Sequence, residues 1–325
     1  MQSYFDALQV LGTVCCHRFR ITWGFQNMRV TLIHNPESGD DDQPGSNEMV
    51  YLMRRRGYEV TYRSYRDQHW EAALDEPTDL VAIAGGDGTI RRVAQRMMGR
   101  DIALTVIPMG TANNIARTLG MVGIPLERQI AGWEHARSIA FDVGTARGSW
   151  GVSHFLEGCG IGLFARLVRQ ADAHPTLTNL PTAEAKIEYA LQMLTESLRD
   201  CPSTHLRVTL DGRDLSGGYL LFEVMNTRYI GPHLHLAPGS DPGDGWLDVV
   251  VARDTDRELL LRHLSSGQNR QQHWPALSRQ RARSLSMQWT GSALHLDDHL
   301  EMSDGGDVEI AIRPGEVRFL LPHCD

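Results

Sequence analysis

Two apolar segments in the first third of the chain each run directly into a glycine-rich turn. Residues 80–84 lead into the turn 85–89 (GGDGT), and residues 102–107 lead into the segment 108–114 (PMGTANN). After the first turn, apolar side chains recur at helical spacing through residues 90–98, which predicts a helix that begins at the end of that turn. The pattern therefore predicts two consecutive units of strand, turn and helix.

The same alternation covers the residues before these two units. We expect strands at 29–33 and 58–62 and helices at 47–56 and 69–75, because apolar periodicity switches between the two spacings there. Together with the two units above, this makes a βαβαβαβα series. Such a series implies a right-handed, doubly wound parallel sheet, and therefore an α/β fold class for this part.

The pattern changes after Gly120. Strands from about residue 139 onward are short, alternate in polarity and are joined by glycine turns such as 211–213, which predicts an antiparallel β-sandwich. A helical stretch between residues 163 and 199 interrupts the strands and carries one apolar stripe, which is typical of a core-facing helix.

The length of 325 residues favours two domains over one. We expect an N-terminal extension at residues 1–27, an α/β domain at 28–138 and a β-sandwich domain at 139–325, whose last segment is free to return to the first domain. A ligand would bind in the cleft between the two domains.

Composition narrows the class of protein. A hydrophobic share of 42% with 22% charged residues is ordinary for a globular protein. The sequence contains no run of about 18 apolar residues, which is the length needed to span a bilayer. The net charge of −8 argues against a nucleic-acid partner. Five cysteines without a CxxC pattern predict reduced thiols in a cytoplasmic protein, and the scattered histidines are interpreted as structural.

The glycine turns suit the binding of an anion. Glycine permits positive φ and lets a large anion approach the backbone amides without meeting a Cβ, while helix N-termini add free N–H groups. Two such turns on neighbouring parallel strands would form one phosphate cradle at the carboxyl edge of the sheet. Asp87 within the first turn is a candidate for positioning Mg²⁺ or a metal-bound water. For GGDG alone, a simple tight turn is the alternative.

The pair GGDGT and PMGTANNIA, about twenty residues apart, resembles the diacylglycerol kinase catalytic domain family, which includes bacterial lipid kinases and sphingosine and ceramide kinases. The first motif alone is shared with NAD kinases, and the second narrows the choice to lipid kinases. The resemblance runs from about Arg29 to the C-terminus. It implies that the turns hold the phosphates of ATP. The nucleotide contacts that it implies are Asn35, Ser64, Gly85, Gly86, Asp87, Gly88, Thr89, Gly110, Thr111 and Asn113.

The resemblance also implies carboxylates that support metal. Asp142 lies where relatives carry an Asp-x-Gly that belongs to the acidic network around the metal, and an ordinary strand aspartate is the alternative. Residues 238–248 resemble a loop that binds a structural Mg²⁺ in bacterial relatives. By position, Asp244 would supply its carboxylate, and Asp241 and Trp246 would supply main-chain oxygens. A metal-free turn is the alternative there.

The segment 295–299 (HLDDH) matches the family's hydrophobic-Asp-Gly-Glu motif, which provides the general base. Asp297 matches the Asp of this motif, whereas Asp298 and His299 replace its Gly and Glu. Three readings stay open: Asp297 suffices as the base, His299 replaces the missing Glu, or catalysis is impaired. Asn114 is a second departure, because many relatives have Asp there.

These observations predict an ATP-dependent lipid kinase that uses Mg²⁺ and phosphorylates diacylglycerol or a similar lipid. Asp87 would organise Mg²⁺, and Asp297, assisted by His299, would accept the proton of the lipid hydroxyl. Two alternatives are an NAD-kinase-like phosphotransferase and a non-catalytic regulator that binds nucleotide or lipid.

One basic segment bears on membrane contact. Residues 257–283 combine six arginines, among them Arg257 and Arg270, with apolar residues that include Trp274, a composition suited to anionic headgroups. A solvated helix face followed by a strand is the alternative. We expect a cytoplasmic protein with peripheral contact with the membrane. The acceptor lipid and the oligomeric state, with a homodimer among the options, stay open.

Overall fold

The structure is a computed structural model. Most of the expected N-terminal extension lies outside the described residues, and so do Cys15, Cys16, Cys324 and Arg270. The two described cysteines, Cys159 and Cys201, are free and buried, in agreement with the prediction of reduced thiols. The described residues are 27–40, 43–173, 180–266, 274–288, 293–302 and 305–323.

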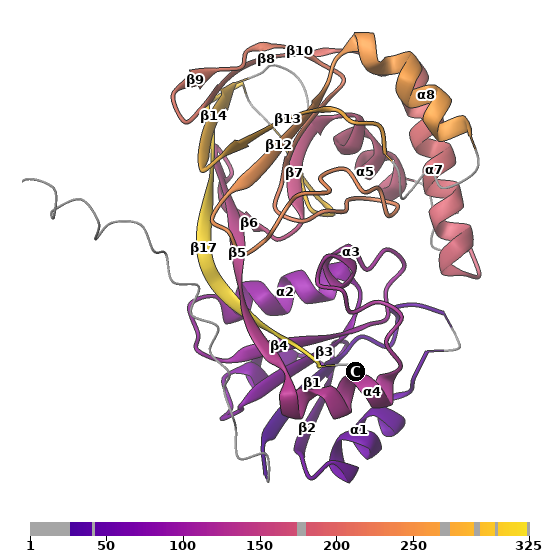
Figure 1. The fold of residues 1–325 in the computed structure, drawn as a ribbon, viewed down its shortest axis with the longest axis vertical. Helices are drawn as coiled ribbons and strands as arrows, with labels where there is room; N and C mark the ends of the chain where they lie inside the picture. The colour runs from indigo at the N-terminus through magenta and orange to yellow at the C-terminus, as the bar shows by residue number, and fades with distance from the viewer. Residues whose placement is uncertain are drawn as a thin grey trace, which may run out of the picture.

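Four parallel strands form the sheet of the N-terminal half, in the order β4-β3-β1-β2 (Figure 1). They coincide with the predicted apolar runs and are β1 (Arg29–His34), β2 (Glu59–Ser64), β3 (Leu80–Gly85) and β4 (Ala103–Pro108). The segment expected to be a helix at 69–75 forms a short 3₁₀ helix. The helical elements of this half are α1 (Ser46–Arg55), η1 (Trp70–Leu74), α2 (Asp87–Met97), α3 (Asn114–Thr118), α4 (Leu126–Ala131) and η2 (Gly132–His135).

One long strand, β17 (Val308–Leu321), belongs to both halves of the molecule. It pairs parallel to β4 in the N-terminal sheet and antiparallel to β14 (Ser284–Gln288) in the C-terminal half. It also pairs with β5 (Arg137–Gly148) along most of its length, with a shift of register between Arg313 and Val317. The two strands therefore form a continuous ribbon between the halves, along one side of the molecule in Figure 1.

Two sheets of antiparallel strands make the C-terminal half, as the alternating polarity predicted. The first continues from β17 and contains β5, β6 (Gly151–Phe155), β8 (Thr204–Leu210), β9 (Arg213–Asp214), β10 (Gly217–Tyr219) and β14. The second contains β7 (Gly158–Gly162), β11 (Leu221–Met225), β12 (Leu247–Ala252), β13 (Ser278–Ala282), β15 (Ala293–Leu296) and β16 (His299–Met302). The helical elements are α5 (Leu163–Ala173), α7 (Ala183–Asp200), η3 (Asp254–Asp256) and α8 (Arg257–Ser265). The predicted fold class is confirmed.

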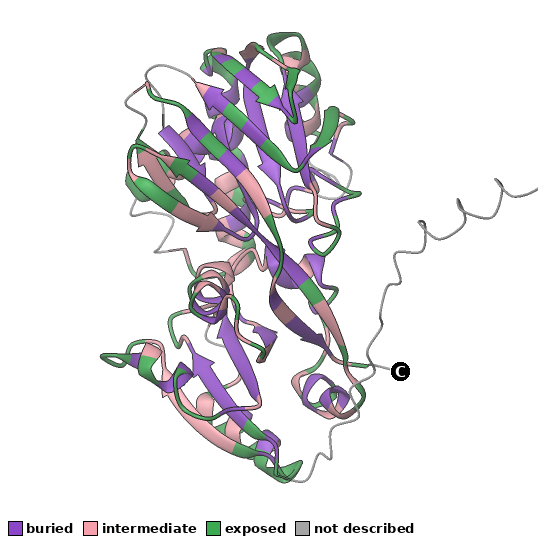
Figure 2. Cartoon of the chain, turned by 90° about the vertical axis from the view of Figure 1, so that its left-hand side faces the viewer, coloured by how far each residue is buried: buried purple, intermediate pink, exposed green. Residues whose placement is uncertain are grey.

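Buried apolar side chains lie on both faces of the N-terminal sheet, against α2 on one face and α1 on the other. In the C-terminal half they fill the space between the two sheets, and the space between the second sheet and the helices α5, α7 and α8. Figure 2 shows these central strands as mostly buried. The apolar stripe predicted for the helical stretch is part of this core and consists of Ile187, Leu191, Leu194 and Leu198.

Candidate active site

The four parallel strands end at one edge of the N-terminal sheet. His34 lies across from Ser64 in β2 and from Ala84 in β3, and Gly85 lies across from Pro108 in β4. The chain therefore leaves all four strands at the same level. This edge is where open α/β sheets bind ligands.

The two glycine turns are in direct contact at this edge. A Cβ on Gly86 would lie 3.0 Å from the Cα of Gly110, and a Cβ on Gly110 would overlap Gly86. A Cβ is excluded at Gly110, and at Gly86 it would press on the backbone of Gly110, so the turns form one surface. Ser38 joins them, because its Oγ accepts a hydrogen bond of 3.3 Å from the N–H of Gly86. The structure thus brings the two predicted turns together.

Helix α2 presents an uncapped N-terminus to this surface. It begins at Asp87, and its N-cap residue, Gly86, has no side chain to bond the first N–H groups. The N–H groups of Asp87, Gly88 and Thr89 therefore point out of the helix, together with the positive end of its dipole. Backbone N–H groups in this arrangement bind phosphate and other anions.

The predicted side-chain contacts of the first turn are partly occupied within the protein. Asn35 Nδ2 donates to Thr89 Oγ1 at 3.1 Å, and the side chain of Thr89 is buried. Asn35 Oδ1 accepts from the N–H of Glu37, also at 3.1 Å. Ser64 lies at the end of β2, where its Oγ accepts from the N–H of Arg66 at 3.2 Å. Nucleotide contacts by these three side chains stay predictions.

Asn113 and Thr111 shape the second turn. Asn113 has a positive φ of 52°, and its side chain bonds both the N–H of Gly110 (2.8 Å) and the carbonyl of Gly110 (2.6 Å). The carbonyl of Thr111 lies 3.1 Å from Nε2 of His233, which belongs to the C-terminal half. The amide of Asn113 therefore closes the turn, and the C-terminal half contacts it.

Asp87 connects the two turns rather than facing solvent. Its Oδ2 accepts from the N–H of Asn114 and its Oδ1 from the N–H of Ile115, both at 3.0 Å, so it caps helix α3. Burial raises the pKa of Asp87 to about 6, with smaller contributions from the charges of Asp297 and Asp298, against the lowering effect of the two backbone hydrogen bonds.

Glu157 is a buried carboxyl that the sequence did not indicate. Its Oε2 accepts from Nδ2 of Asn114 at 2.9 Å. Burial raises its pKa well above the usual range, and the nearby carboxyls of Asp87 and Asp297 raise it further. Glu157 directly precedes β7, in the sequence FLEGCG. A charged residue among apolar and glycine positions was the one feature of the sequence that could have indicated a buried carboxyl.

The expected base, Asp297, accepts three hydrogen bonds from the backbone. Its Oδ2 accepts from the N–H of Leu156 (2.9 Å), and its Oδ1 accepts from the N–H groups of Glu157 (2.8 Å) and Gly158 (3.1 Å). Its side chain is only 4% exposed, and burial raises its pKa. Asp297 does lie near α2, because its Oδ2 is 3.9 Å from Nε of Arg91, and its negative charge contributes to the raised pKa of Asp87.

His299, the expected assistant of Asp297, points elsewhere. Its side chain is 58% exposed, and Nε2 lies 3.3 Å from Oε1 of Glu301 on the same strand. Asp298 is the residue of this turn that reaches the glycine surface. Its Oδ1 accepts from Nη2 of Arg91 at 2.8 Å, and its Oδ2 lies 3.0 Å from where a Cβ on Gly88 would be.

Two family models match the chain in succession. The model described as the diacylglycerol kinase catalytic domain matches residues 29–146, which include both glycine turns. The model described as the YegS C-terminal NAD kinase beta sandwich-like domain matches residues 164–321. Residues 29–146 therefore belong to the diacylglycerol kinase catalytic domain family, and residues 164–321 match the C-terminal domain model.

Relatives of this lipid kinase family include a diacylglycerol kinase of Mycobacterium tuberculosis, 28% identical over 245 residues, with 72% of this chain and 76% of that protein covered. A protein named as a YegS-like lipid kinase of Stenotrophomonas maltophilia is 27% identical over 314 residues, covering 90% and 96%. The crystal structure of a diacylglycerol kinase from Bacillus anthracis strain Sterne superposes with a TM-score of 0.65 at 20% identity, covering 92% and 98%, and supports the fold.

The loop that would hold a structural Mg²⁺ in a diacylglycerol kinase is closed here by protein groups. Asp244 Oδ1 accepts from the N–H of Trp246 at 3.0 Å, and Asp244 Oδ2 pairs with the guanidinium of Arg281. Asp241 Oδ1 accepts from the N–H of Gly243 at 3.1 Å. An arginine thus occupies the carboxylate expected for the metal, and this arrangement does not fit a magnesium site.

Asp142, the other predicted metal-supporting residue, bonds the same loop. Its Oδ2 accepts from the N–H of Gly245 and its Oδ1 from the N–H of Gly315, both at 2.7 Å. Burial raises its pKa, and the charges of Asp244 and Asp241 add to the effect. The structure therefore brings Asp142, Asp241 and Asp244 together, beside the register shift of β17.

The described part of the basic segment 257–283 is largely engaged within the protein. Arg257 Nη2 donates to the carbonyl of Cys201 at 2.7 Å, Trp274 is buried, and Arg281 pairs with Asp244. Leu259 and Arg262 are exposed on α8. Within the described ranges, no helix has the length and apolar character needed to cross a bilayer.

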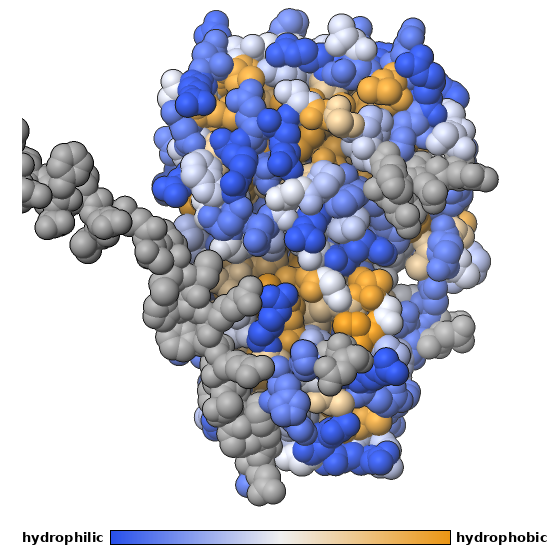
Figure 3. Space-filling model, in the orientation of Figure 1, coloured by the Kyte–Doolittle hydropathy of each residue, from blue (hydrophilic) through white to orange (hydrophobic). Residues whose placement is uncertain are grey.

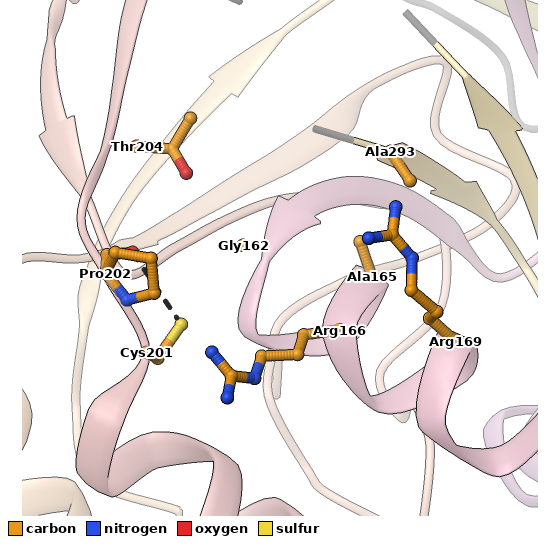
Figure 4. Close-up of a pocket in the computed structure, with 8 residues that line it drawn as sticks. All are labelled: Gly162, Ala165, Arg166, Arg169, Cys201, Pro202, Thr204 and Ala293. Atoms are coloured by element: carbon orange, nitrogen blue, oxygen red, sulfur yellow. Dashed lines mark hydrogen bonds between the residues drawn. The ribbon is translucent and has the colours of Figure 1, made fainter. Parts of the chain in front are cut away.

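A cavity of about 170 Å³ lies at the end of β7 remote from Asp297. Figure 4 shows the side chains of Arg166, Arg169 and Cys201 around it, and Arg166 Nη2 also pairs with Asp200 at 3.0 Å. None of the predicted site residues lines this cavity. Its lining consists of Gly162, Ala165, Arg166, Arg169, Cys201, Pro202, Thr204 and Ala293.

Proposed function

We propose that the chain is an ATP-dependent lipid kinase that transfers the γ-phosphate to a lipid hydroxyl, with diacylglycerol or a similar lipid as the acceptor. The observation that carries this proposal is the contact of Gly86 with Gly110 at the uncapped start of α2. Phosphoryl transfer depends mainly on positioning the phosphates and stabilising their charge. The surface formed by the two turns suits both tasks.

The backbone N–H groups at the start of α2 would hold the phosphates. Mg²⁺ in phosphotransferases is usually bound by one or two carboxylates together with the phosphates of the substrate, and it offsets charge on the phosphate oxygens. Asp87 would supply a carboxylate for this role, because it is the first residue of α2. Its pKa of about 6 reflects burial and nearby negative charge, which a cation would relieve.

The hydroxyl of the acceptor lipid would approach the phosphates from the region where the N-terminal and C-terminal halves meet. Figure 3 shows apolar side chains in the part of the N-terminal half that is nearest the C-terminal half, on the face seen in Figure 1. Apolar surface of this kind suits a lipid that is presented by a membrane. We propose peripheral contact of a cytoplasmic protein with the membrane during turnover.

The experiment is a transfer assay with labelled ATP, Mg²⁺ and mixed micelles that contain diacylglycerol, ceramide or sphingosine. We expect label in the lipid fraction with at least one acceptor. Binding of ATP without label in any lipid would favour a non-catalytic regulator, an alternative supported by the engaged carboxylate of Asp297. Phosphorylation of NAD without lipid would indicate an NAD-kinase-like enzyme.

A further inference from the structure

Consecutive side chains of the turn between β15 and β16 point in different directions. Asp297 points into the protein, where three backbone N–H groups bond its carboxylate. His299 points along β16 toward Glu301. Asp298 points toward α2, where it contacts Arg91 and lies against Gly88.

The engaged state of Asp297 matters for proton transfer. A carboxylate offers about four lone-pair positions, and Asp297 uses three of them for backbone N–H groups. Its side chain is also 4% exposed, so little of it is open to an incoming hydroxyl. Asp297 is suited to fixing the start of β7 and the turn that carries Asp298.

Asp298 has the opposite character. Its side chain is 64% exposed, and one oxygen, Oδ1, is held at 2.8 Å by Nη2 of Arg91. Nε of the same arginine lies 3.9 Å from Oδ2 of Asp297, so Arg91 faces both aspartates of the turn. The other oxygen, Oδ2, lies against Gly88, whose N–H is one of the phosphate-binding groups proposed above. A general base must lie within hydrogen-bond reach of the proton that it accepts.

We propose that Asp298 is the catalytic base of this chain, an inference that rests on the proposed lipid kinase function. The acceptor oxygen forms a bond to the γ-phosphorus while the bond from this phosphorus to the ADP oxygen breaks, and ADP leaves with that electron pair. The proton of the acceptor hydroxyl passes to Oδ2 of Asp298. The residue stands where the family motif has glycine, one position before the replaced glutamate.

The test compares Asp298→Asn with a matched control in the transfer assay. Asparagine keeps the shape of the side chain and an oxygen for Arg91, but it cannot accept the proton. Asp254→Asn is the control, because Asp254 is also an exposed aspartate (69%) paired with a mostly buried arginine, Arg257. ATP affinity is measured for each variant by calorimetry.

We expect Asp298→Asn to lower kcat by about 100-fold, the lower end of the range for general-base catalysis, because the transition state is loose. Its affinity for ATP and its melting temperature should match those of Asp254→Asn. An unchanged kcat would overturn the inference, and so would an increase, which would mean that Asp298 merely repels the phosphates. If the wild-type protein transfers no label, the proposed function fails and the inference fails with it.

Discussion

The side-chain amide of Asn114 donates a hydrogen bond of 2.9 Å to the buried carboxyl of Glu157 and joins the second glycine turn to the C-terminal half. It also donates to the carbonyl of Gly231 at 3.1 Å. An aspartate at position 114 would set a second carboxyl against Glu157 and would lose the amide N–H groups that donate to Glu157 and to the carbonyl of Gly231. The departure from the family motif therefore has a local physical reason.

We expect Asn114→Asp to lower the free energy of unfolding by about 2 kcal/mol, because a buried hydrogen bond is replaced by repulsion between carboxyls. Urea denaturation of the variant measures this loss. The double variant Asn114→Asp, Glu157→Gln restores a donor and acceptor pair and should recover at least half of the loss. Strictly additive effects would contradict a direct interaction.

Gly110→Ala should abolish measurable ATP binding, because its Cβ would overlap Gly86 and separate the two turns. Gly45→Ala is the matched control, since Gly45 has no heavy atom within 4 Å of an added Cβ and its φ is negative. Calorimetric titration with ATP compares the two variants. Equal affinities would show that the contact of the turns is not needed for nucleotide binding.

The raised pKa of Asp87, about 6 against 3.8 in an unfolded chain, predicts a pH dependence of stability. Between these two values the folded protein binds more protons than the unfolded chain, so this group makes the free energy of unfolding fall as pH rises. From pH 5 to pH 7 the loss should be about 1 kcal/mol.

The measurement is denaturation of the wild type and of Asp87→Asn at both pH values. The asparagine variant lacks the titrating group, so only the difference between the two proteins reports on Asp87. If the free energy of unfolding of the wild type rose relative to that of Asp87→Asn between pH 5 and pH 7, the pKa of Asp87 would not be raised.

The ion pair of Asp244 with Arg281 predicts that Mg²⁺ has little effect on the stability of this loop. We expect the melting temperature of the wild type to differ by less than about 1 °C between excess MgCl₂ and EDTA, because a ligand that does not bind does not stabilise. In Arg281→Met the carboxylate loses its partner, and Mg²⁺ should then raise the melting temperature.

Arg283→Met is the matched control for this experiment. Arg283 stacks on the ring of Trp246 at 4.5 Å, as Arg281 does at 5.2 Å, and no ion pair of Arg283 with Asp244 occurs in the described part of the chain. A clear effect of Mg²⁺ on the wild type would support the metal site that the sequence predicted.

Local pattern was sufficient to predict most of the fold. The strands β1 to β4 follow apolar runs, and the glycine turns mark their ends, because both features depend on neighbouring residues alone. The sequence allowed the last segment to return to the first domain but did not predict that β17 pairs with β4. The partner of a strand depends on contacts between segments that are distant in sequence. The length of β17, 14 residues, was likewise not visible in the pattern.

The candidate site was predicted in its backbone parts and less well in its side chains. The contact of Gly86 with Gly110 follows from two turns at one sheet edge. The role of Asp297 as an acceptor for three backbone N–H groups depends on how β15 meets the start of β7, which no motif encodes. The sequence showed Asp298 only as a replacement of the glycine in the family motif. Its contact with α2 depends on how the turn between β15 and β16 packs against that helix.

Because β17 pairs with strands of both halves, it affects how the protein folds during translation. Its strand partner β4 emerges from the ribosome about 200 residues earlier, and until β17 follows, the edge of β4 stays open to pairing with other chains. The first half cannot finish folding during translation while the second half is being made. Completion of the first sheet should therefore depend on the second half, which supplies β17.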